Sequence, residues 1–174
     1  MDVTDELVNS QSSSLRPRRS WPGAKPPQPP FRWSDLWLAP LHDFTIREEI
    51  LYQYLPLSPT MEVLEVGPGS GFTAFRLARQ VRQLTLVEIA AEVIAVLREQ
   101  LRHLPNIQYV CADLAQPGLV ARTHRQDFDA AFALDVLQYV VDPAAALHNL
   151  REVLRPGGKL LLSYPNIPPH WATG

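Results

Sequence analysis

Short apolar runs alternate with segments of helical spacing between residues 61 and 163, and this alternation predicts an α/β fold. Five runs are apolar at most positions, which is typical of strands buried on both faces of a parallel sheet. They cover residues 63–66, 84–87, 107–111, 128–134 and 160–162. Strands that alternate with helices in this order predict a doubly wound, mostly parallel sheet flanked by helices.

The helices are marked by capping signals and by apolar residues that recur every three or four positions. Thr45 and Glu48 form a capping box, and Asp142 followed by Pro143 is typical of an N-cap and first helical position. We expect Pro156–Gly158 to form a turn before the last strand. A further helix is predicted over residues 72–78. The predicted inward stripes are Ile46, Ile50 and Tyr54; Val93, Leu97, Leu101 and Leu104; and Leu147, Leu150 and Leu154.

The first 31 residues differ in composition from the rest of the chain. Six of the 17 prolines fall between Pro17 and Pro30, after a polar stretch without periodicity. Such a segment has too few apolar residues to join a core, so we expect residues 1–31 to be a disordered, proline-rich tail and residues 32–174 to be the domain. The run Pro26–Pro29 matches a P-x-x-P ligand, although a solvated linker is the favoured interpretation.

A glycine-rich turn follows the first predicted strand directly and precedes a helix. Its sequence is Glu65-Val66-Gly67-Pro68-Gly69-Ser70-Gly71. Glycines at this position allow a tight turn and let a ligand approach the backbone, while the helix start offers free N–H groups. Glu88 ends the second predicted strand, 21 residues after Gly67, and Asp113 follows the third. Because the carboxyl ends of parallel strands line one crevice, we expect these two acids to converge there, while a helix N-cap or a solvated turn is the alternative for each acid taken singly.

Composition and charge exclude several classes of protein. The chain has 46% apolar residues and a net charge of −2, which argues against a protein that grips nucleic acid through phosphates. Cys111 is the only cysteine, so disulfide scaffolds and cysteine zinc sites are excluded, and a cytoplasmic location is expected. The most apolar stretch, Phe128–Val141, contains two aspartates, and the acidic start lacks a secretory leader, so no membrane association is expected. His103, His124 and His170 show no metal-ligand spacing, and no metal is expected.

Several motifs together resemble, in order and spacing, those of class I S-adenosylmethionine-dependent methyltransferases. They are EVGPGSG, LVEI, CADL, FDAAFALDVLQYVVDP and LRPGGKLLL, and they span roughly Met61 to Ser163. The run from Asp135 through Gly158 is most similar to the broad small-molecule branch of that family. The resemblance implies a Rossmann-like fold, S-adenosyl-L-methionine as the cofactor, and methyl transfer to a small-molecule acceptor.

The resemblance also implies a role for each matching residue. Gly67, Gly69 and Gly71 would wrap the methionine part of the cofactor. Glu65 would assist the methionine amino group, Glu88 would bind the ribose, and Asp113 would meet the adenine amino group. The remaining implied cofactor contacts are the apolar flanks Ile89 and Leu114, together with Asp135 at the border between cofactor and acceptor.

The catalytic group is not identified by the sequence. A sulfonium methyl is already activated, so its transfer needs in-line placement and exclusion of water more than a catalytic triad. A base is required only where the acceptor must lose a proton. His42 and Tyr139 are the two candidates for a role at the acceptor, although a capping or surface role is favoured for His42 and a packed aromatic is the alternative for Tyr139. His148 is expected to be solvated.

The chain departs from the family at its end, and this leaves alternatives open. The sequence stops about ten residues after the fifth strand, whereas the family sheet continues, so the fold is expected to be truncated there. Leu160–Leu162 would then form an exposed edge that favours a homodimer. A non-catalytic or truncated cofactor-binding module is one alternative. An RNA adenine methyltransferase is another, disfavoured because residues 134–137 lack the N-x-P-Y motif and the chain is acidic.

Overall fold

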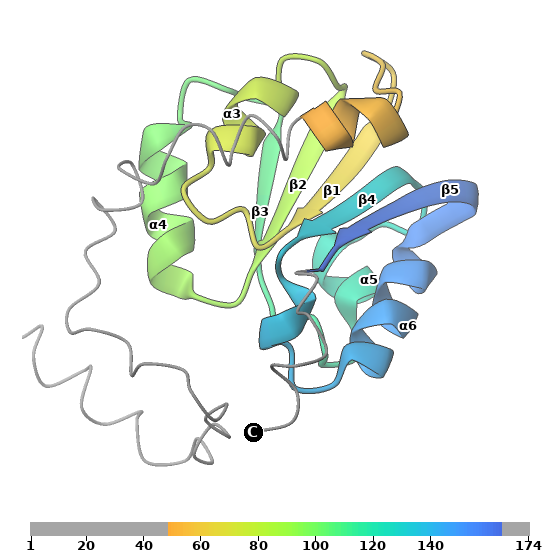
Figure 1. The fold of residues 1–174 in the computed structure, drawn as a ribbon. Coiled ribbons are helices and arrows are strands. Elements are labelled where there is room, and N and C mark those ends of the chain that lie inside the picture. The colour runs from red at the N-terminus through yellow and green to blue at the C-terminus, as the bar shows by residue number, and fades with distance from the viewer. Residues whose placement is uncertain (1–48, 165–174) are drawn as a thin grey trace, which may run out of the picture. The chain divides into compact units, whose positions relative to one another are not determined.

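The strands form one parallel sheet in the computed structural model, which describes residues 49–164. Its order is β3-β2-β1-β4-β5 (Figure 1). The strands are β1 (Glu62–Val66), β2 (Gln83–Glu88), β3 (Ile107–Cys111), β4 (Phe128–Leu134) and β5 (Leu154–Ser163). This order is that of a doubly wound sheet, so the predicted fold class is confirmed. The tail over residues 1–31 and the capping box Thr45–Glu48 lie outside the described residues.

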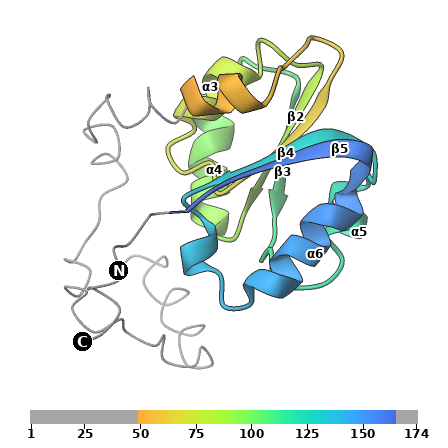
Figure 2. The same ribbon diagram turned by 45° about the vertical axis from the view of Figure 1, so that its right-hand side comes forward.

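Helices cover both faces of the sheet. They are α3 (Phe72–Leu77), α4 (Ala91–Gln100), α5 (Leu119–Thr123), the 3-10 helix η2 (Leu137–Tyr139) and α6 (Pro143–Val153), with residues 49–54 also helical. Figures 1 and 2 show α3 and α4 on one face and α5 and α6 on the other. No helix within residues 49–164 has the length and apolar character needed to cross a bilayer.

Two hydrophobic layers follow from the alternation of side chains along each strand. On β1, Val63 packs with residues of α3 and α4, whereas Leu64 and Val66 pack with residues of α5 and α6. All three side chains are nearly inaccessible to solvent. A strand that is buried on both faces explains why the sequence of β1 is apolar at most positions.

The predicted stripe of the helix over residues 49–54 is wrong in phase, and that of α6 is right only at Leu150, which is buried. In the helix over residues 49–54, Ile50 and Tyr54 are exposed, whereas Leu51 and Leu55 are buried. In α6, Leu147 is 38% exposed, and Leu154 belongs to β5 instead. The residues of α6 that face inward are Ala146, Asn149, Leu150 and Val153. Apolar residues at adjacent positions permit two stripes of equal spacing, and only tertiary packing selects one of them.

A buried amide explains why α6 turns Asn149 inward. Its Nδ2 atom donates to the carbonyl oxygens of Leu114 at 2.8 Å and Gln116 at 2.9 Å. These bonds satisfy the amide and tie α6 to the segment that follows β3. The predicted N-cap of α6 is confirmed, because the Asp142 side chain accepts a hydrogen bond from the Ala145 N–H at 3.0 Å.

The predicted turn at Pro156–Gly158 is instead a bulged part of β5. Phe128 pairs with Leu154, but Ala130 pairs with Lys159, so the register shifts there. Gly157 has φ +77°. A Cβ atom at Gly158 would lie 3.0 Å from the backbone oxygens of Arg155 and Phe128. The two glycines therefore allow a wide bulge where the sequence suggested a chain reversal.

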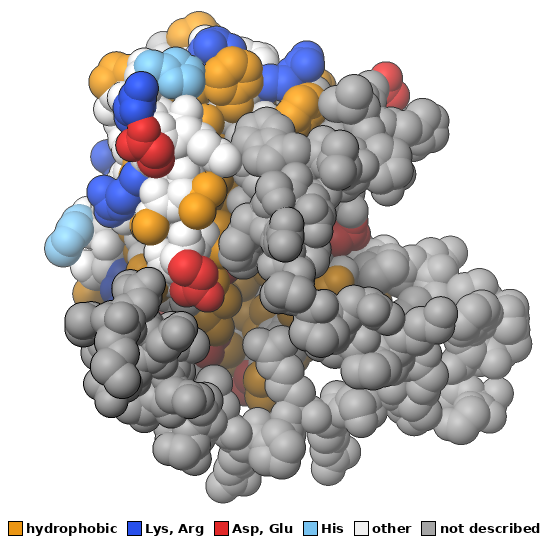
Figure 3. Space-filling model, turned by 90° about the vertical axis from the view of Figure 1, so that its left-hand side faces the viewer, with side chains coloured by type: hydrophobic (Ala, Val, Ile, Leu, Met, Phe, Trp, Pro, Cys, Tyr) orange, Lys and Arg blue, Asp and Glu red, His pale blue; other side chains and the backbone are white. Residues whose placement is uncertain are grey.

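The outer side of α3 and α4 is basic and partly aromatic. The Arg79 guanidinium lies 3.9 Å from the centroid of the Phe75 ring, and the Phe75 ring lies 5.8 Å from that of His103. Basic side chains gather around hydrophobic ones in the space-filling view of this side (Figure 3). These contacts cover the half-buried Phe75 ring with the arginine.

A network of charged groups joins the amino ends of the central strands. Glu62, which is buried, accepts a hydrogen bond from Arg82 Nε at 2.6 Å. The Glu62 N–H donates to Asp129 Oδ2 at 2.7 Å, and Arg155 Nε donates to Asp129 Oδ1 at 2.7 Å. Burial alone would raise the pKa of Asp129, but these hydrogen bonds and the charges of Arg155 and Arg82 hold it below its usual value.

We expect Asp129→Asn to destabilise the domain by about 1 kcal/mol at pH 7, because the charge-assisted bonds are weakened. A lowered pKa means that the carboxylate stabilises the fold above its unfolded pKa. That contribution disappears as the pH falls through the folded value, below about pH 4. Urea denaturation of both proteins between pH 3 and pH 8 measures this effect. A gap that stays constant down to pH 3 would contradict it, and the exposed Glu152→Gln serves as the control variant.

Candidate functional site

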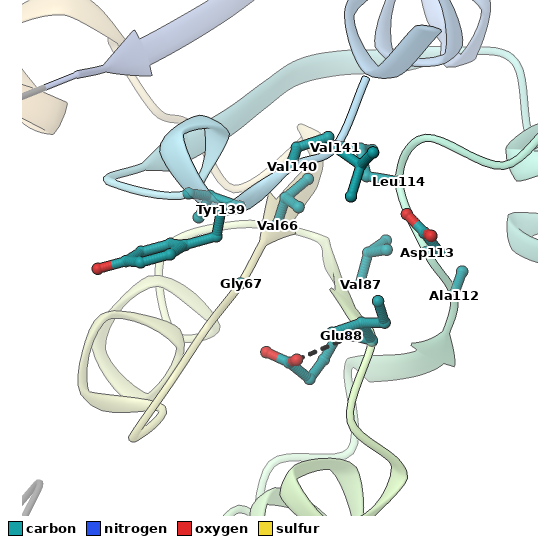
Figure 4. Close-up of a pocket in the computed structure, with 12 residues that line it drawn as sticks. Val66, Gly67, Val87, Glu88, Ala112, Asp113, Leu114, Tyr139, Val140 and Val141 are labelled. Carbon is teal, nitrogen blue, oxygen red and sulfur yellow. Dashed lines mark hydrogen bonds between the residues drawn. The ribbon is translucent and has the colours of Figure 1, made fainter. Parts of the chain in front are cut away.

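The candidate site is a pocket at the carboxyl ends of the parallel strands (Figure 4). Its lining comes from the segments that follow β1, β2, β3 and β4. The lining residues are Val66, Gly67, Val87, Glu88, Ile89, Ala112, Asp113, Leu114, Val136, Tyr139, Val140 and Val141. The pocket thus brings together the glycine turn and both strand-end acids, as the sequence predicts.

The turn after β1 requires glycine at two positions for different reasons. Gly67 has φ +65°, and a Cβ atom there would lie 2.6 Å from Val136 Cγ2. Gly71 has φ +76°, and its Cβ would lie 2.5 Å from Leu97 Cδ2. Because Gly67 has no side chain, the segment after β4 can pack closely on the turn. Because Gly71 has none, α3 can begin in contact with α4. Gly69 is also left-handed, but a Cβ atom there would meet nothing within 4 Å, so that side of the turn is open.

Glu88 holds its own loop in place at the end of β2. Its Oε1 atom accepts a hydrogen bond from the Ile89 N–H at 2.8 Å (Figure 4) and another from the Ala90 N–H at 3.0 Å. Ala90 is the N-cap of α4 and supplies no side-chain cap. The carboxylate therefore satisfies the backbone that leads into the helix and lines the pocket at the same time.

Asp113 repeats this arrangement at the end of β3. Its Oδ1 atom accepts a hydrogen bond from the Ala115 N–H at 2.9 Å. The backbone N–H of Ala112 donates to the Glu88 carbonyl oxygen at 2.9 Å, which links the two strand ends. Leu114 is buried and lines the pocket beside Asp113, whereas Ile89 is 66% exposed at its rim. Acidic and apolar groups thus alternate along this wall.

Glu65 is buried in β1 and does not line the pocket. Its Oε2 atom is inaccessible and has no hydrogen-bond partner among the described residues. Burial raises the pKa of this carboxyl to about 8. A buried carboxyl with an unmet oxygen, two residues before a ligand-accessible turn, has the chemistry to accept a hydrogen bond from a cationic donor.

Asp135 follows β4 in a left-handed conformation, with φ +55°. It does not line the pocket, but the residues that follow it do. Its N–H and its Oδ1 atom both bond to the Ser163 hydroxyl at 2.9 Å. A non-glycine residue held in this region at a pocket edge is a recognised sign of a functional constraint.

Most of the apolar wall was missed by the sequence analysis. Val136, Val140 and Val141 come from the segment after β4, and Val141 is 98% exposed. The signal was present as the apolar run VLQYVV, which has the pattern of a continued core. Tyr139 lines the pocket and is 79% exposed.

Several predicted residues lie elsewhere. Gly69, Gly71, Glu65 and Asp135 flank the pocket in sequence without lining it. His148 lies on the exposed side of α6, where its Nε2 atom is 3.5 Å from Glu152 Oε1. His42 lies outside the described residues. Within residues 49–164, no group of three or more His, Cys, Asp or Glu side chains is placed to hold a metal ion.

The sequence of the chain is similar to a known protein family and to curated proteins. The family model described as a methyltransferase domain matches residues 64–162. The chain is 36% identical over 129 residues to a protein named ubiquinone biosynthesis O-methyltransferase from Xylella fastidiosa (strain 9a5c). That alignment covers 73% of this chain and 51% of the relative. The chain therefore spans about half the length of the curated relatives it matches.

Solved structures share the fold. The [4+2]-cyclase SpnF is 26% identical with a TM-score of 0.58, covering 67% of this chain and 43% of that one. The N-methyltransferase NodS from Bradyrhizobium japonicum WM9, in complex with S-adenosyl-L-homocysteine, has a TM-score of 0.59. It is 23% identical and covers 69% of this chain and 60% of that one, so it shows likeness of fold alone.

We expect Gly67→Ala to destabilise the domain more than Gly69→Ala. Both substitutions place a side chain in a left-handed conformation, at a cost of about 1–2 kcal/mol. Only the first also meets Val136 Cγ2, and such overpacking adds about 1 kcal/mol or more. Urea denaturation of the two variants measures the difference. In a Val136→Ala background the extra cost at position 67 is expected to vanish. Equal costs in all backgrounds would show that the close approach is unimportant.

Proposed function

Because the chain belongs to the methyltransferase domain family, we propose that it binds S-adenosylmethionine and transfers the methyl group to a small-molecule acceptor. One observation carries the proposal: the glycine turn at Gly67 and the strand-end acids Glu88 and Asp113 line the same pocket. The family match covers residues 64–162, which include all of these elements. The names of the curated relatives support an oxygen as the acceptor atom.

The residues present fit the cofactor. The turn at Gly69 has an open side for a close ligand, and we propose that Glu65, which is buried behind the turn and is not part of the pocket lining, meets the amino group of the methionine part through its unmet Oε2 atom. Glu88 offers a carboxylate to the two ribose hydroxyls, since carboxylates accept charge-assisted hydrogen bonds. Asp113 suits the adenine amino group, and the exposed Ile89 and buried Leu114 suit the faces of the ring.

The chain's own contribution to catalysis is mainly placement. When bound, the cofactor supplies a sulfonium methyl that is already activated for displacement. The residues that follow β4 supply an apolar wall, and Val136 and Val140 in this wall exclude water from the reacting groups. A hydroxyl acceptor must lose a proton, and Asp135 and Tyr139 are the titratable groups next to this wall. We propose Tyr139 as an acceptor contact, because it lines the pocket and is 79% exposed.

A second proposal is a module that binds the cofactor without methyl transfer. It is supported by the likeness to the [4+2]-cyclase SpnF, since one fold serves different reactions. Heat of cofactor binding without methyl transfer to any tested small-molecule acceptor would favour it. In either case we propose that residues 32–174 form the binding domain after a proline-rich tail over residues 1–31. A cytoplasmic location is supported by the exposed free thiol of Cys111.

Titration with S-adenosylhomocysteine tests the cofactor assignment through Glu65. At pH 7 a carboxyl with a pKa of about 8 is mostly protonated, and a bound ammonium group lowers that pKa. We therefore expect binding to release close to one proton, measured by calorimetry in phosphate and in Tris, whose ionisation enthalpies differ. Glu65→Gln should abolish the release and weaken binding about ten- to a hundredfold.

The control for this titration is Glu99→Gln. Glu99 is exposed on α4 and pairs with Arg102, so its substitution should change neither affinity nor proton release. An absence of binding heat at millimolar ligand from the folded wild-type protein would refute the proposed function. Binding without proton release would refute the role of Glu65 alone.

We also propose that the chain forms a homodimer through the edge of β5. Among the described strands β5 pairs with β4 alone, and Leu160 on it is 36% exposed. An unpaired strand edge is a template for another chain. Light scattering after gel filtration should give twice the mass of one chain for the wild-type protein. For Leu160→Lys it should give the mass of a single chain. Val141→Lys, at an exposed site that lines the pocket and lies away from β5 in sequence, should leave the dimer intact. A wild-type monomer at several hundred micromolar would contradict the proposal.

A further inference from the structure

One hydroxyl group joins the carboxyl ends of β4 and β5. Ser163 is the last residue of β5 and pairs in register with Leu134, the last residue of β4. Its Oγ atom accepts a hydrogen bond from the Asp135 N–H at 2.9 Å and donates one to Asp135 Oδ1 at 2.9 Å. The same hydroxyl therefore fixes both the backbone and the side chain of Asp135.

This fixation matters because Asp135 has a left-handed backbone, with φ +55°. Such a conformation is unfavourable for a residue with a Cβ atom and persists only where the surroundings enforce it. Aspartate tolerates it better than most residues, because its short side chain can form local hydrogen bonds. The Ser163 hydroxyl supplies two of the bonds that favour it.

The conformation of Asp135 determines where the next residues lie. The chain leaves β4 at this point, and Val136 packs so closely on the glycine turn that a Cβ atom at Gly67 would lie 2.6 Å from it. The Val136 carbonyl oxygen then accepts a hydrogen bond from the Tyr139 N–H at 2.9 Å, within η2. Val136 and Tyr139 both line the pocket, whereas Ser163 does not.

We propose that Ser163 is a positioning residue for the pocket, which acts by holding Asp135 in the left-handed conformation. Through Asp135 it places Val136 against the glycine turn and Tyr139 at the pocket rim. This inference rests on the proposed function, because it assigns Ser163 an effect on cofactor affinity. It also gives β5 a role at the site that is separate from its role in the sheet.

A matched pair of substitutions isolates the hydroxyl. Ser163→Thr and Ser163→Val introduce side chains of nearly the same shape, both suited to a strand, and only threonine retains the hydroxyl. We expect the dissociation constant of the Ser163→Thr variant for S-adenosylhomocysteine to stay within about twofold of the wild-type value. Ser163→Val should raise this dissociation constant about five- to tenfold, as expected for the loss of one or two hydrogen bonds. Calorimetry at 25 °C, with circular dichroism to confirm folding, measures both.

Two further variants complete the test. Ser163→Ala should weaken binding of S-adenosylhomocysteine as much as Ser163→Val does. It takes the place of Ser163→Val in the comparison if that variant does not fold. Ser58→Ala should leave the affinity unchanged, because the Ser58 hydroxyl bonds only to the exposed Thr60 hydroxyl among the described residues, at 2.9 Å.

The outcomes separate the two proposals. Suppose that the wild-type protein binds S-adenosylhomocysteine and that Ser163→Thr and Ser163→Val either keep this affinity or lose it to the same extent. The hydroxyl then has no positioning role, and the inference is overturned. If the folded wild-type protein shows no binding at millimolar ligand, then the proposed function fails first. Near-wild-type affinity in Ser163→Thr together with weakened binding in Ser163→Val supports the role of the Ser163 hydroxyl, since a change in packing would affect both variants alike.

Discussion

The parallel pairing of β1 with β2 on one side and β4 on the other is the constraint on which the rest of the structure depends. Glu65 is aligned with Leu86 and Phe132 in the two neighbouring strands. All three strands consequently end at the same edge of the sheet. The glycine turn, the carboxylate of Glu88 and the left-handed Asp135 meet there because the strands run in one direction and in this register.

The parts of the site that the sequence predicts are those encoded locally. A strand buried on both faces has an apolar run, and a turn with positive φ at close approach has glycine, so Gly67 and Gly71 were found directly. The acids followed from strand ends, and Glu88 and Asp113 do line one pocket. The residue types at these positions could be recognised from the neighbouring sequence, although the contacts that require them, such as Val136 at Gly67 and Leu97 at Gly71, come from distant segments.

The parts that were missed depend on contacts between distant segments. Spacing alone does not choose between Ile50 and Leu51 as the inward residue, because the sheet makes that choice. The bulge in β5 depends on how Gly158 fits against the Phe128 carbonyl oxygen. The apolar wall around Val136 was hidden because an apolar run after a strand has the same pattern whether it lines a core or a pocket.

Glu88 and Glu65 show two ways in which this fold holds a carboxylate at one edge of the sheet. Glu88 satisfies its own loop, since its Oε1 atom accepts two backbone hydrogen bonds that fix the direction of the side chain. Glu65 is buried with an unmet oxygen, and burial raises its pKa from 4.5 to about 8. Because the folded chain then binds this proton more tightly than the unfolded chain, the carboxyl makes the fold progressively less stable as the pH rises from 4.5 to about 8. A ligand that brought a positive charge to this oxygen would lower that cost, which is the physical basis of the role proposed for Glu65. The sheet core, with Leu64 and Phe132 fully buried beside it, supplies the stability that makes such an arrangement tolerable.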